Sequence, residues 1–318
     1  MTDEAIIPNP EAPVLVIGAA SVDIVGRLRG ELNLGTSNPA QIRSSFGGVA
    51  RNVAENLARL GQPVILLTAI GDDAAGERLA RQTMEAGVDM SATLRVPHTP
   101  TNTYLAIVNV KGKLQVALDD MRTTNAISPE YLEQKADCFR NASLVFLDAN
   151  LSREALSKAI SLARRAKVPI CADPTSAVLA KRIKPHLSKL YLVTPNHSEA
   201  SVLCERVVDP SRSDDALDSA KCLVSQGVRI AIVTLAEFGV CYATSQTSGF
   251  VPSIRTEVVD PTGGGDAMTA AVLFALLNNI PLDDAVRLGV SAATLTLRYS
   301  GAVVPDLSLE KLYDALVI

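Results

Sequence analysis

Short apolar runs recur along the chain, and helix-like stretches lie between most of them. Each run ends at glycine or polar residues, which is typical of strands buried on both faces of a parallel sheet. The predicted strands cover residues 14–17, 64–70, 144–147, 168–172, 191–193 and 230–234, and the predicted helices cover residues 49–60, 74–86, 153–166 and 216–226. Strands that alternate with helices predict an α/β fold in which helices cover both faces of a mostly parallel sheet.

One region breaks this alternation. Between residues 94 and 121 several strand-like segments follow one another without a helix, and a turn at Lys111 and Gly112 separates two of them. Residues 22–29 and 41–45 have the same character. We therefore expect a small β-sheet lid built from residues 22–45 and 94–121. An antiparallel extension at the edge of the main sheet would give the same pattern.

Composition and charge narrow the class of protein. The chain has 318 residues, 47% of them hydrophobic, which is enough to form the core of one large domain. We expect this domain at residues 13–318, after a flexible tail at residues 1–12. The net charge of −4 gives no basic surplus for nucleic acid or anionic lipid, and no apolar run is long enough to span a bilayer. The N-terminal residues lack the pattern of a signal peptide, which predicts a cytoplasmic protein.

The cysteines and histidines do not suggest a metal site. The five cysteines form no C-x-x-C pair, and the three histidines are dispersed along the chain. Zinc ligands or a cysteine nucleophile paired with histidine would have to come from distant segments. We expect reduced, mostly buried thiols.

The most informative motif is a glycine turn between two aspartates, Asp260-Pro261-Thr262-Gly263-Gly264-Gly265-Asp266, which leads into an apolar helix-forming stretch. Glycines can adopt backbone conformations that are barred to other residues, so their N–H groups can converge at the positive end of the helix. Such a site suits a phosphate or the charge that develops on one during transfer. Asp266 can reach the same space and accept a proton from a hydroxyl group. A turn whose aspartate merely caps a helix would explain the same residues without chemistry.

Other polar motifs follow predicted strands, where open parallel sheets bind their ligands. Asp23 comes after the first strand, and its carboxylate suits hydrogen bonds from sugar hydroxyls. Gly47 and Gly48 allow a ligand to approach the backbone at a helix start, and Asn52 lies one turn further on. The chain contains neither G-x-G-x-x-G nor G-x-x-x-x-G-K-[ST], which disfavours a nicotinamide enzyme and a P-loop protein.

Two further motifs have both a ligand-binding and a purely structural interpretation. Asn196 and Glu199 are three residues apart after a predicted strand, so they suit a hydrated Mg²⁺ and phosphate oxygens. A capping box, in which Asn196 begins the helix and Glu199 reaches back, explains the same spacing. The turn from Thr234 to Gly239 either places backbone against a nucleotide or joins two strands.

Four motifs together resemble the ribokinase (PfkB-type) carbohydrate kinase family, in order and over nearly the whole chain. They are Gly18-x-x-Ser21-x-Asp23, Gly47-Gly48-x-x-x-Asn52, Asn196-x-x-Glu199 and Asp260-x-Thr262-Gly263-Gly264-Gly265-Asp266. The resemblance implies a ribokinase-like three-layer α/β/α sandwich with a β-sheet lid. It also implies phosphoryl transfer from ATP, with Mg²⁺, to a hydroxyl of a sugar or nucleoside.

The resemblance assigns a role to each matching residue. It implies that Asp266 is the catalytic base and that Gly263, Gly264 and Gly265 form the anion hole. It further implies that Asp23, Gly47, Gly48 and Asn52 bind substrate, that Asn196 and Glu199 hold Mg²⁺ and phosphate through water, that Thr234 and Gly239 border ATP, and that Asp260 and Thr262 bind a monovalent cation such as K⁺.

Within the family, the segments at residues 36–42, 47–61, 118–121, 148–150 and 173–176 are most similar to bacterial pseudouridine kinases. This similarity implies transfer to the 5′-hydroxyl of pseudouridine, with Ser37, Asn38, Asn150 and Asp173 near the acceptor. The alternatives are ribose, another nucleoside, 2-keto-3-deoxygluconate or fructose phosphate, and, in a different class, a non-catalytic sugar sensor. An exposed lid sheet would also allow two chains to pair as a homodimer.

Three motifs depart from the residues usual in the family. Ser21 stands where the family has asparagine, and Ala236 stands where the nucleotide loop has glycine. In the glycine turn, Pro261 replaces threonine and Gly264 replaces alanine. Pro261 has no N–H to donate, so it changes the loop to which the resemblance assigns a cation.

Overall fold

A large, mostly parallel sheet forms the centre of the computed structural model, which describes residue 9 and residues 11–316. Most of the tail expected at residues 1–12 therefore lies outside the described residues. The eight strands are, in spatial order, β14 (Ser248–Val251), β13 (Val240–Ala243), β12 (Ile230–Thr234), β11 (Leu192–Val193), β10 (Ile170–Asp173), β9 (Leu144–Asp148), β1 (Val14–Ile17) and β4 (Val64–Leu67). From β12 to β4 the pairing is parallel, whereas β13 and β14 add an antiparallel edge.

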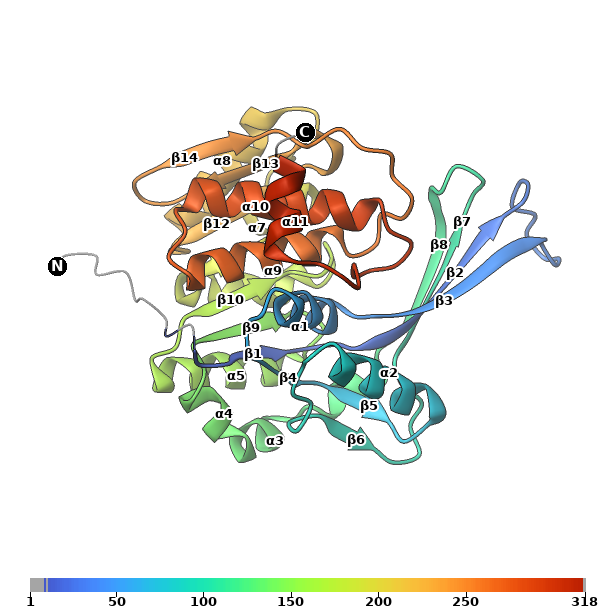
Figure 1. Cartoon of the computed structure of the whole chain (residues 1–318), viewed down its shortest axis with the longest axis horizontal. Helices are drawn as coiled ribbons and strands as arrows, with labels where there is room; N and C mark the ends of the chain where they lie inside the picture. The colour runs from blue at the N-terminus through green and yellow to red at the C-terminus, as the bar shows by residue number, and fades with distance from the viewer. Residues whose placement is uncertain (1–8, 10, 317–318) are drawn as a thin grey trace.

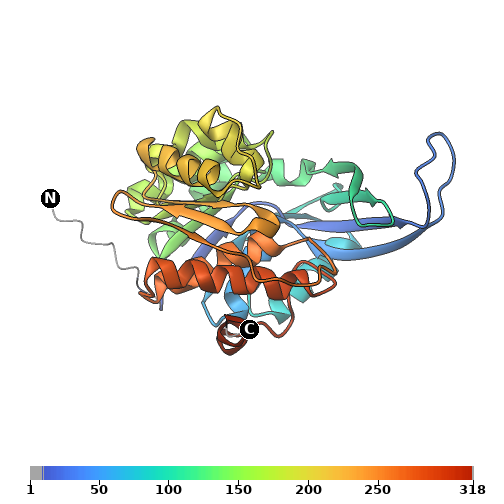
Figure 2. The same ribbon diagram turned by 90° about the horizontal axis from the view of Figure 1, so that it is seen from above.

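Helices cover both faces of this sheet, as the alternating pattern predicts (Figures 1 and 2). Successive strand residues enter opposite cores: Leu15 and Ile17 belong to one, and Val14 and Val16 to the other. The first face carries α3 (Pro129–Gln134), α4 (Ala136–Arg140), α5 (Arg153–Ala166), α6 (Ala180–Ile183), α7 (His197–Cys204) and α8 (Ser213–Ser225), and the second carries α1 (Val49–Arg59), α2 (Ala74–Glu85), α9 (Gly264–Leu277), α10 (Leu282–Leu297) and α11 (Leu309–Leu316). The described part of the chain has no helix with the length and apolarity needed to cross a bilayer.

A second sheet stands away from this body, on the right of Figure 1. It contains β3 (Ala40–Gly47), β2 (Ser21–Leu28), β7 (Thr103–Val108) and β8 (Leu114–Asp120), in that order. The β2–β7 pair is parallel and the other two pairs are antiparallel. We call these four strands the lid sheet. Because β2 follows β1 after a short connection, the lid sheet begins where the central strands end.

Two strand predictions were wrong in detail. The strand predicted at residues 64–70 is broken at Thr68, whose hydroxyl donates a 2.7 Å hydrogen bond to the Gly18 carbonyl oxygen. The chain then continues as β5 (Ala69–Gly71), which pairs in parallel with β6 (Leu94–Val96) in a separate two-stranded sheet. Residues 94–96, expected in the lid, therefore belong elsewhere.

Candidate functional site

Acidic side chains gather where the carboxyl ends of the central strands meet the lid sheet. They are Asp23 on β2, Asp148 and Asp173 at the ends of β9 and β10, Glu199 in the first turn of α7 and Asp266 in the first turn of α9. Burial raises the pKa of Asp266 well above its usual range, and the charges of Asp173, Asp148 and Asp23 raise it further. The fold thus concentrates negative charge around one half-buried carboxyl group.

Asp266 lies at the N-terminus of α9, and α1 holds its carboxylate. Asn52, on α1, donates a 2.7 Å hydrogen bond from Nδ2 to Asp266 Oδ2. The first hydrogen bond of α9 runs from Ala267 N to Gly263 O. The N–H groups of Gly264, Gly265 and Asp266 therefore precede the regular helix bonds and are available to an anion. The Asp266 carboxylate and these N–H groups thus lie in the same turn, and the binding of an anion there stays a prediction.

The three glycines of the turn differ in their backbone conformation. Gly263 has φ 80°, and a Cβ there would lie 2.1 Å from the carbonyl oxygen of Ala302. Gly264 and Gly265 are already helical. Of the three, Gly263 alone has the positive φ that favours glycine, because the helix already includes Gly264 and Gly265. A Cβ on Gly265 would meet no atom within 4 Å, so open space lies above the first helical turn.

The hydrogen bond from Asn52 predicts a pH effect. This bond lowers the pKa of Asp266, against the upward effects of burial and neighbouring carboxylates. In Asn52→Leu the pKa of Asp266 should rise further, so a base that must be ionised becomes protonated at higher pH. We expect the acidic limb of the kcat/KM profile to move to higher pH than in the wild type. If the acidic limb of the kcat/KM profile does not move in this variant, Asn52 does not control the protonation of Asp266.

Asp148 is a central residue that we did not single out from the sequence. It is fully buried, and its carboxylate accepts backbone hydrogen bonds from Ala19 (2.9 Å), Ala50 (3.1 Å) and Asn150 (2.9 Å). A Cβ on Gly18 would lie 2.3 Å from Asp148 Oδ2, which explains the glycine. Asp148 therefore joins the loops after β1 and β9 to the start of α1. In the sequence, the position of this acidic residue directly after a fully apolar run could have identified it as a candidate.

Asp23 occupies a space that glycine creates. It is 7% exposed and accepts a 2.8 Å hydrogen bond from the Ser21 hydroxyl. A Cβ on Gly47 would lie 2.0 Å from Asp23 Oδ2, and a Cβ on Gly48 would lie 2.4 Å from the Ala19 carbonyl oxygen. The paired glycines thus have a packing role in addition to any contact with a ligand. Burial raises the pKa of Asp23.

Asp173 and Glu199 interact across the ends of β10 and β11. Asp173 accepts a 2.7 Å hydrogen bond from Thr175 N, and burial together with the Glu199 charge raises its pKa well above the usual range. Burial, with a smaller effect from Asp266, raises the pKa of Glu199 to about 7. Glu199 also completes a capping box: its Oε2 accepts from Asn196 N at 2.8 Å, and Asn196 Oδ1 accepts from Glu199 N at 3.0 Å. The structural interpretation of this spacing is thus confirmed, and a ligand role would be additional.

Thr234 and Gly239 flank the connection between β12 and β13. Thr234 N donates to the Pro195 carbonyl oxygen at 3.0 Å, which places it beside the Asn196 turn. Gly239 has φ 111°, and a Cβ there would lie 2.5 Å from the Val251 carbonyl oxygen. Packing against β14 thus explains this glycine. Ala236, which stands where the family has glycine, adopts φ 49°.

Asp260 connects the glycine turn to the lid sheet. Its Oδ1 accepts a 3.0 Å hydrogen bond from Thr262 N, and its carboxylate pairs with Arg43 of β3 at 3.5 Å. Arg43 also donates to the Ser300 hydroxyl. Within the described residues no cluster of three or more histidine, cysteine, aspartate or glutamate side chains is arranged to hold a metal ion. A cation at Asp260 and Thr262 would therefore have to share the carboxylate with Arg43.

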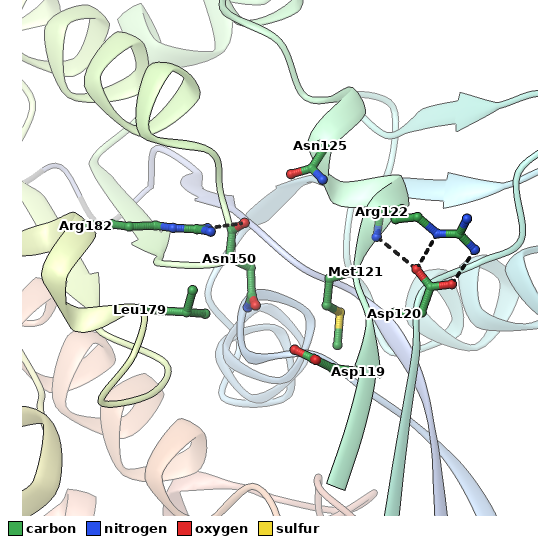
Figure 3. A pocket seen from close by; sticks show the side chains of 8 residues that line it. All are labelled: Asp119, Asp120, Met121, Arg122, Asn125, Asn150, Leu179 and Arg182. Carbon is green, nitrogen blue, oxygen red and sulfur yellow. Dashed lines mark hydrogen bonds and ion pairs between the residues drawn. The ribbon is translucent and has the colours of Figure 1, made fainter.

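Not every candidate substrate residue lies at this site. Ser37 and Asn38 belong to the β2–β3 loop at the outer end of the lid sheet, which extends beyond the body in Figure 2. There Asn38 stabilises the loop itself through hydrogen bonds with the Asn33 backbone at 2.8 and 2.9 Å. Asn150 instead lines a cavity of about 540 Å³ between the β8 end of the lid sheet and the body (Figure 3).

Comparison with known proteins identifies the family. Residues 12–308 match the pfkB family of carbohydrate kinases. The chain is 34% identical to pseudouridine kinase of Escherichia coli, over 93% of this chain and 94% of that one, and 27% identical to guanosine-inosine kinase of Exiguobacterium acetylicum, over 92% and 97%. Its fold matches Arabidopsis thaliana ribokinase in complex with ribose and ATP, with TM-score 0.82 and 22% identity over 96% of this chain and 99% of that one. The chain therefore belongs to the pfkB carbohydrate kinase family and is an ATP-dependent sugar or nucleoside kinase.

Proposed function

We propose that this enzyme transfers the γ-phosphate of ATP to the 5′-hydroxyl of a ribosyl nucleoside, with pseudouridine as the preferred acceptor. The observation that carries the kinase chemistry is the half-buried Asp266 beside the unused N–H groups that begin α9. The identity to the E. coli pseudouridine kinase supports the choice of acceptor. The guanosine-inosine and ribose kinases among the relatives are the reason that other acceptors must be tested.

In this mechanism Asp266 accepts the proton of the attacking hydroxyl, and the Asn52 amide holds the carboxylate in place. The first-turn N–H groups of α9 stabilise the charge on the transferring phosphoryl group. Asp23 accepts hydrogen bonds from sugar hydroxyls and, with Asn52, orients the acceptor. The enzyme thus contributes position and electrostatic stabilisation, which supply most of the rate enhancement in phosphoryl transfer.

A divalent cation would be held through water at the acidic cluster, because the described side chains form no direct metal site. Burial raises the pKa values of Asp173 and Glu199, and the charges of neighbouring carboxylates raise them further. Glu199 and Asn196 would hold Mg²⁺ through water, and Mg²⁺ bound with ATP would neutralise phosphate charge. Thr234 and Gly239 would border the nucleotide. A K⁺ ion at Asp260 and Thr262 belongs to the same proposal.

If pseudouridine is the acceptor, the enzyme should prefer it measurably to related sugars and nucleosides. A site with polar groups matched to a base loses their hydrogen bonds when the acceptor lacks that base, which can reduce turnover by up to about 10⁴-fold. We expect kcat/KM for pseudouridine to be well above that for ribose and measurably above that for uridine. A turnover screen should also include inosine, 2-keto-3-deoxygluconate and fructose 6-phosphate. If ribose is turned over as well as pseudouridine, the acceptor is wrong and the kinase chemistry stands.

The site is less suited to an acceptor that already carries a phosphate group. Such a substrate needs a free basic side chain near Asp23. Arg51 is the basic group whose charge acts on Asp23, but it is buried and paired with Glu55. Arg43, on the neighbouring strand, is paired with Asp260. Both cations are therefore committed to carboxylates. A sugar sensor without activity would leave the arrangement of Asp266 and α9 unexplained.

We also propose that the lid sheet closes over the acceptor and pairs two chains. One face of this sheet, at alternate positions, carries apolar side chains, of which Ile42 is 70% exposed and Leu118 63% exposed. Such a face is costly to leave in water, and a second copy of the same sheet would cover it. Leu118→Glu should convert a dimer into a monomer in sedimentation analysis. Wild-type enzyme that sediments as a monomer at micromolar concentration would contradict the pairing.

A further inference from the structure

The other face of the lid sheet carries a row of polar side chains that points toward the acidic cluster. In the strand register Ser45 pairs with Asp23, Asp23 with Tyr104, and Tyr104 with Asp119. Residues directly opposite one another on neighbouring strands share a face of the sheet. Asp119 of this row lines a cavity together with Asn150 and Leu179 of the body, so this face is turned toward the body and its acidic cluster. Tyr104 and Asp119 therefore extend the acceptor site outward from Asp23.

Tyr104 lies between two carboxylates. The strand register places it beside Asp23 on one side and Asp119 on the other, and partial burial together with their charges raises its pKa. An aromatic ring beside a sugar-binding carboxylate provides a surface on which a planar group can pack.

The cavity of about 540 Å³ begins where this row ends. Its size is within the range of about 300–1,000 Å³ that small-molecule sites occupy. Figure 3 shows Asp119 and Met121 on one side of the cavity, and Asn150 and Leu179 on the other. The cavity thus has apolar side chains for the faces of a flat ring, together with a carboxylate and an amide for its polar edge.

Most charged groups of the cavity already have partners. Arg122 pairs with Asp120 at 2.6 Å, and Arg182 donates to the carbonyl oxygens of Ala149, Asn150 and Leu151 at 2.9 to 3.2 Å. Arg182 thereby fixes the backbone that carries Asn150. The Asp119 carboxylate, in contrast, makes no hydrogen bond or ion pair with another described residue. This carboxylate faces the cavity and is available to accept a hydrogen bond from a ligand.

We propose that this cavity is the base subsite of the acceptor site, and that Asp119 accepts a hydrogen bond from a ring N–H of a pyrimidine-2,4-dione. This inference rests on the proposed nucleoside kinase activity. The dione has N–H donors that a carboxylate can accept and carbonyl oxygens to which the Asn150 amide can donate. Pseudouridine is joined to the sugar through carbon, so its N1 carries a proton and presents an N–H where uridine presents only a C–H; a carboxylate at this edge therefore favours pseudouridine. Free ribose does not reach Asp119, which then remains hydrated.

The test compares Asp119→Asn and Asp119→Ala with the wild type, using pseudouridine, uridine and ribose as acceptors. A lost hydrogen bond to a charged acceptor should lower kcat/KM for pseudouridine about 10- to 100-fold, whereas kcat/KM for ribose should change by less than about threefold. Glu31→Gln is the matched control, because it removes one negative charge from the exposed β2–β3 loop of the same lid sheet. Uridine identifies the donor: if uridine turnover is unaffected, Asp119 binds the N–H that only pseudouridine has.

The outcomes separate the two proposals. A wild-type enzyme that does not prefer nucleosides to ribose would overturn the proposed acceptor and, with it, the base subsite. A wild-type preference for pseudouridine that persists in both Asp119 variants would overturn the base subsite alone. An equal loss with pseudouridine and ribose would also overturn it, because Asp119 would then support the lid sheet or the sugar rather than the base.

Discussion

Asp266→Asn should lower kcat by about 10³-fold or more while Mg·ATP binds with nearly unchanged affinity. The amide has the same shape as the carboxylate but cannot take the proton of the acceptor hydroxyl. Nucleotide affinity should persist because the residues expected at the nucleotide, on β12 and α7, are untouched. The measurement is kcat with the preferred acceptor, together with Mg·ATP affinity by calorimetry.

Stability provides an independent check on this variant. Folding raises the pKa of Asp266 above its unfolded value, so at neutral pH its ionised form reduces the free energy of unfolding. Removing the charge should therefore leave the thermal midpoint equal or higher. Asp284→Asn is the matched control, because Asp284 is an exposed aspartate in the first turn of the next helix, α10. If Asp266→Asn retains a tenth of the wild-type kcat, Asp266 is not the base.

The sequence predicted the elements well where local pattern alone determines them. The strands at 14–17 and 230–234 and the helix at 153–166 match β1, β12 and α5, because each is a continuous apolar or amphipathic segment with clear ends. The break at Thr68 could not be predicted, since it depends on a hydrogen bond to Gly18, fifty residues away. The pairing of β6 with β5, rather than with the lid sheet, follows from that break.

In the candidate site, too, the features set by local sequence could be predicted, whereas those that depend on distant residues could not. The position of Asp266 in a first helical turn follows from the adjoining apolar stretch, and the structure bears it out. Its hydrogen bond to Asn52 joins two helices far apart in the chain, so spacing could not reveal it. Asp148 was missed because its role lies in joining two loops to the start of α1. Ser37 and Asn38 were expected near the acceptor through similarity of a short segment, which carries no information about where a hairpin ends in space.

The glycine turn offers the second large effect, because two of its glycines are needed for different reasons. Gly263 adopts a positive φ and has no room for a side chain, so Gly263→Ala should destabilise the fold and lower activity together. Gly265 is helical and faces open space, so Gly265→Ala should leave the thermal midpoint unchanged or slightly higher.

The open space above Gly265 is where an anion would approach the first-turn N–H groups of α9. A methyl group there should displace the transferring phosphoryl group by about an ångström, which lowers kcat/KM about 100-fold. Activity and thermal unfolding measured on the same preparations of Gly265→Ala and Gly263→Ala would separate the two effects. A Gly265→Ala enzyme that is both stable and fully active would show that the phosphoryl group is bound elsewhere, and the role of this turn would then be structural.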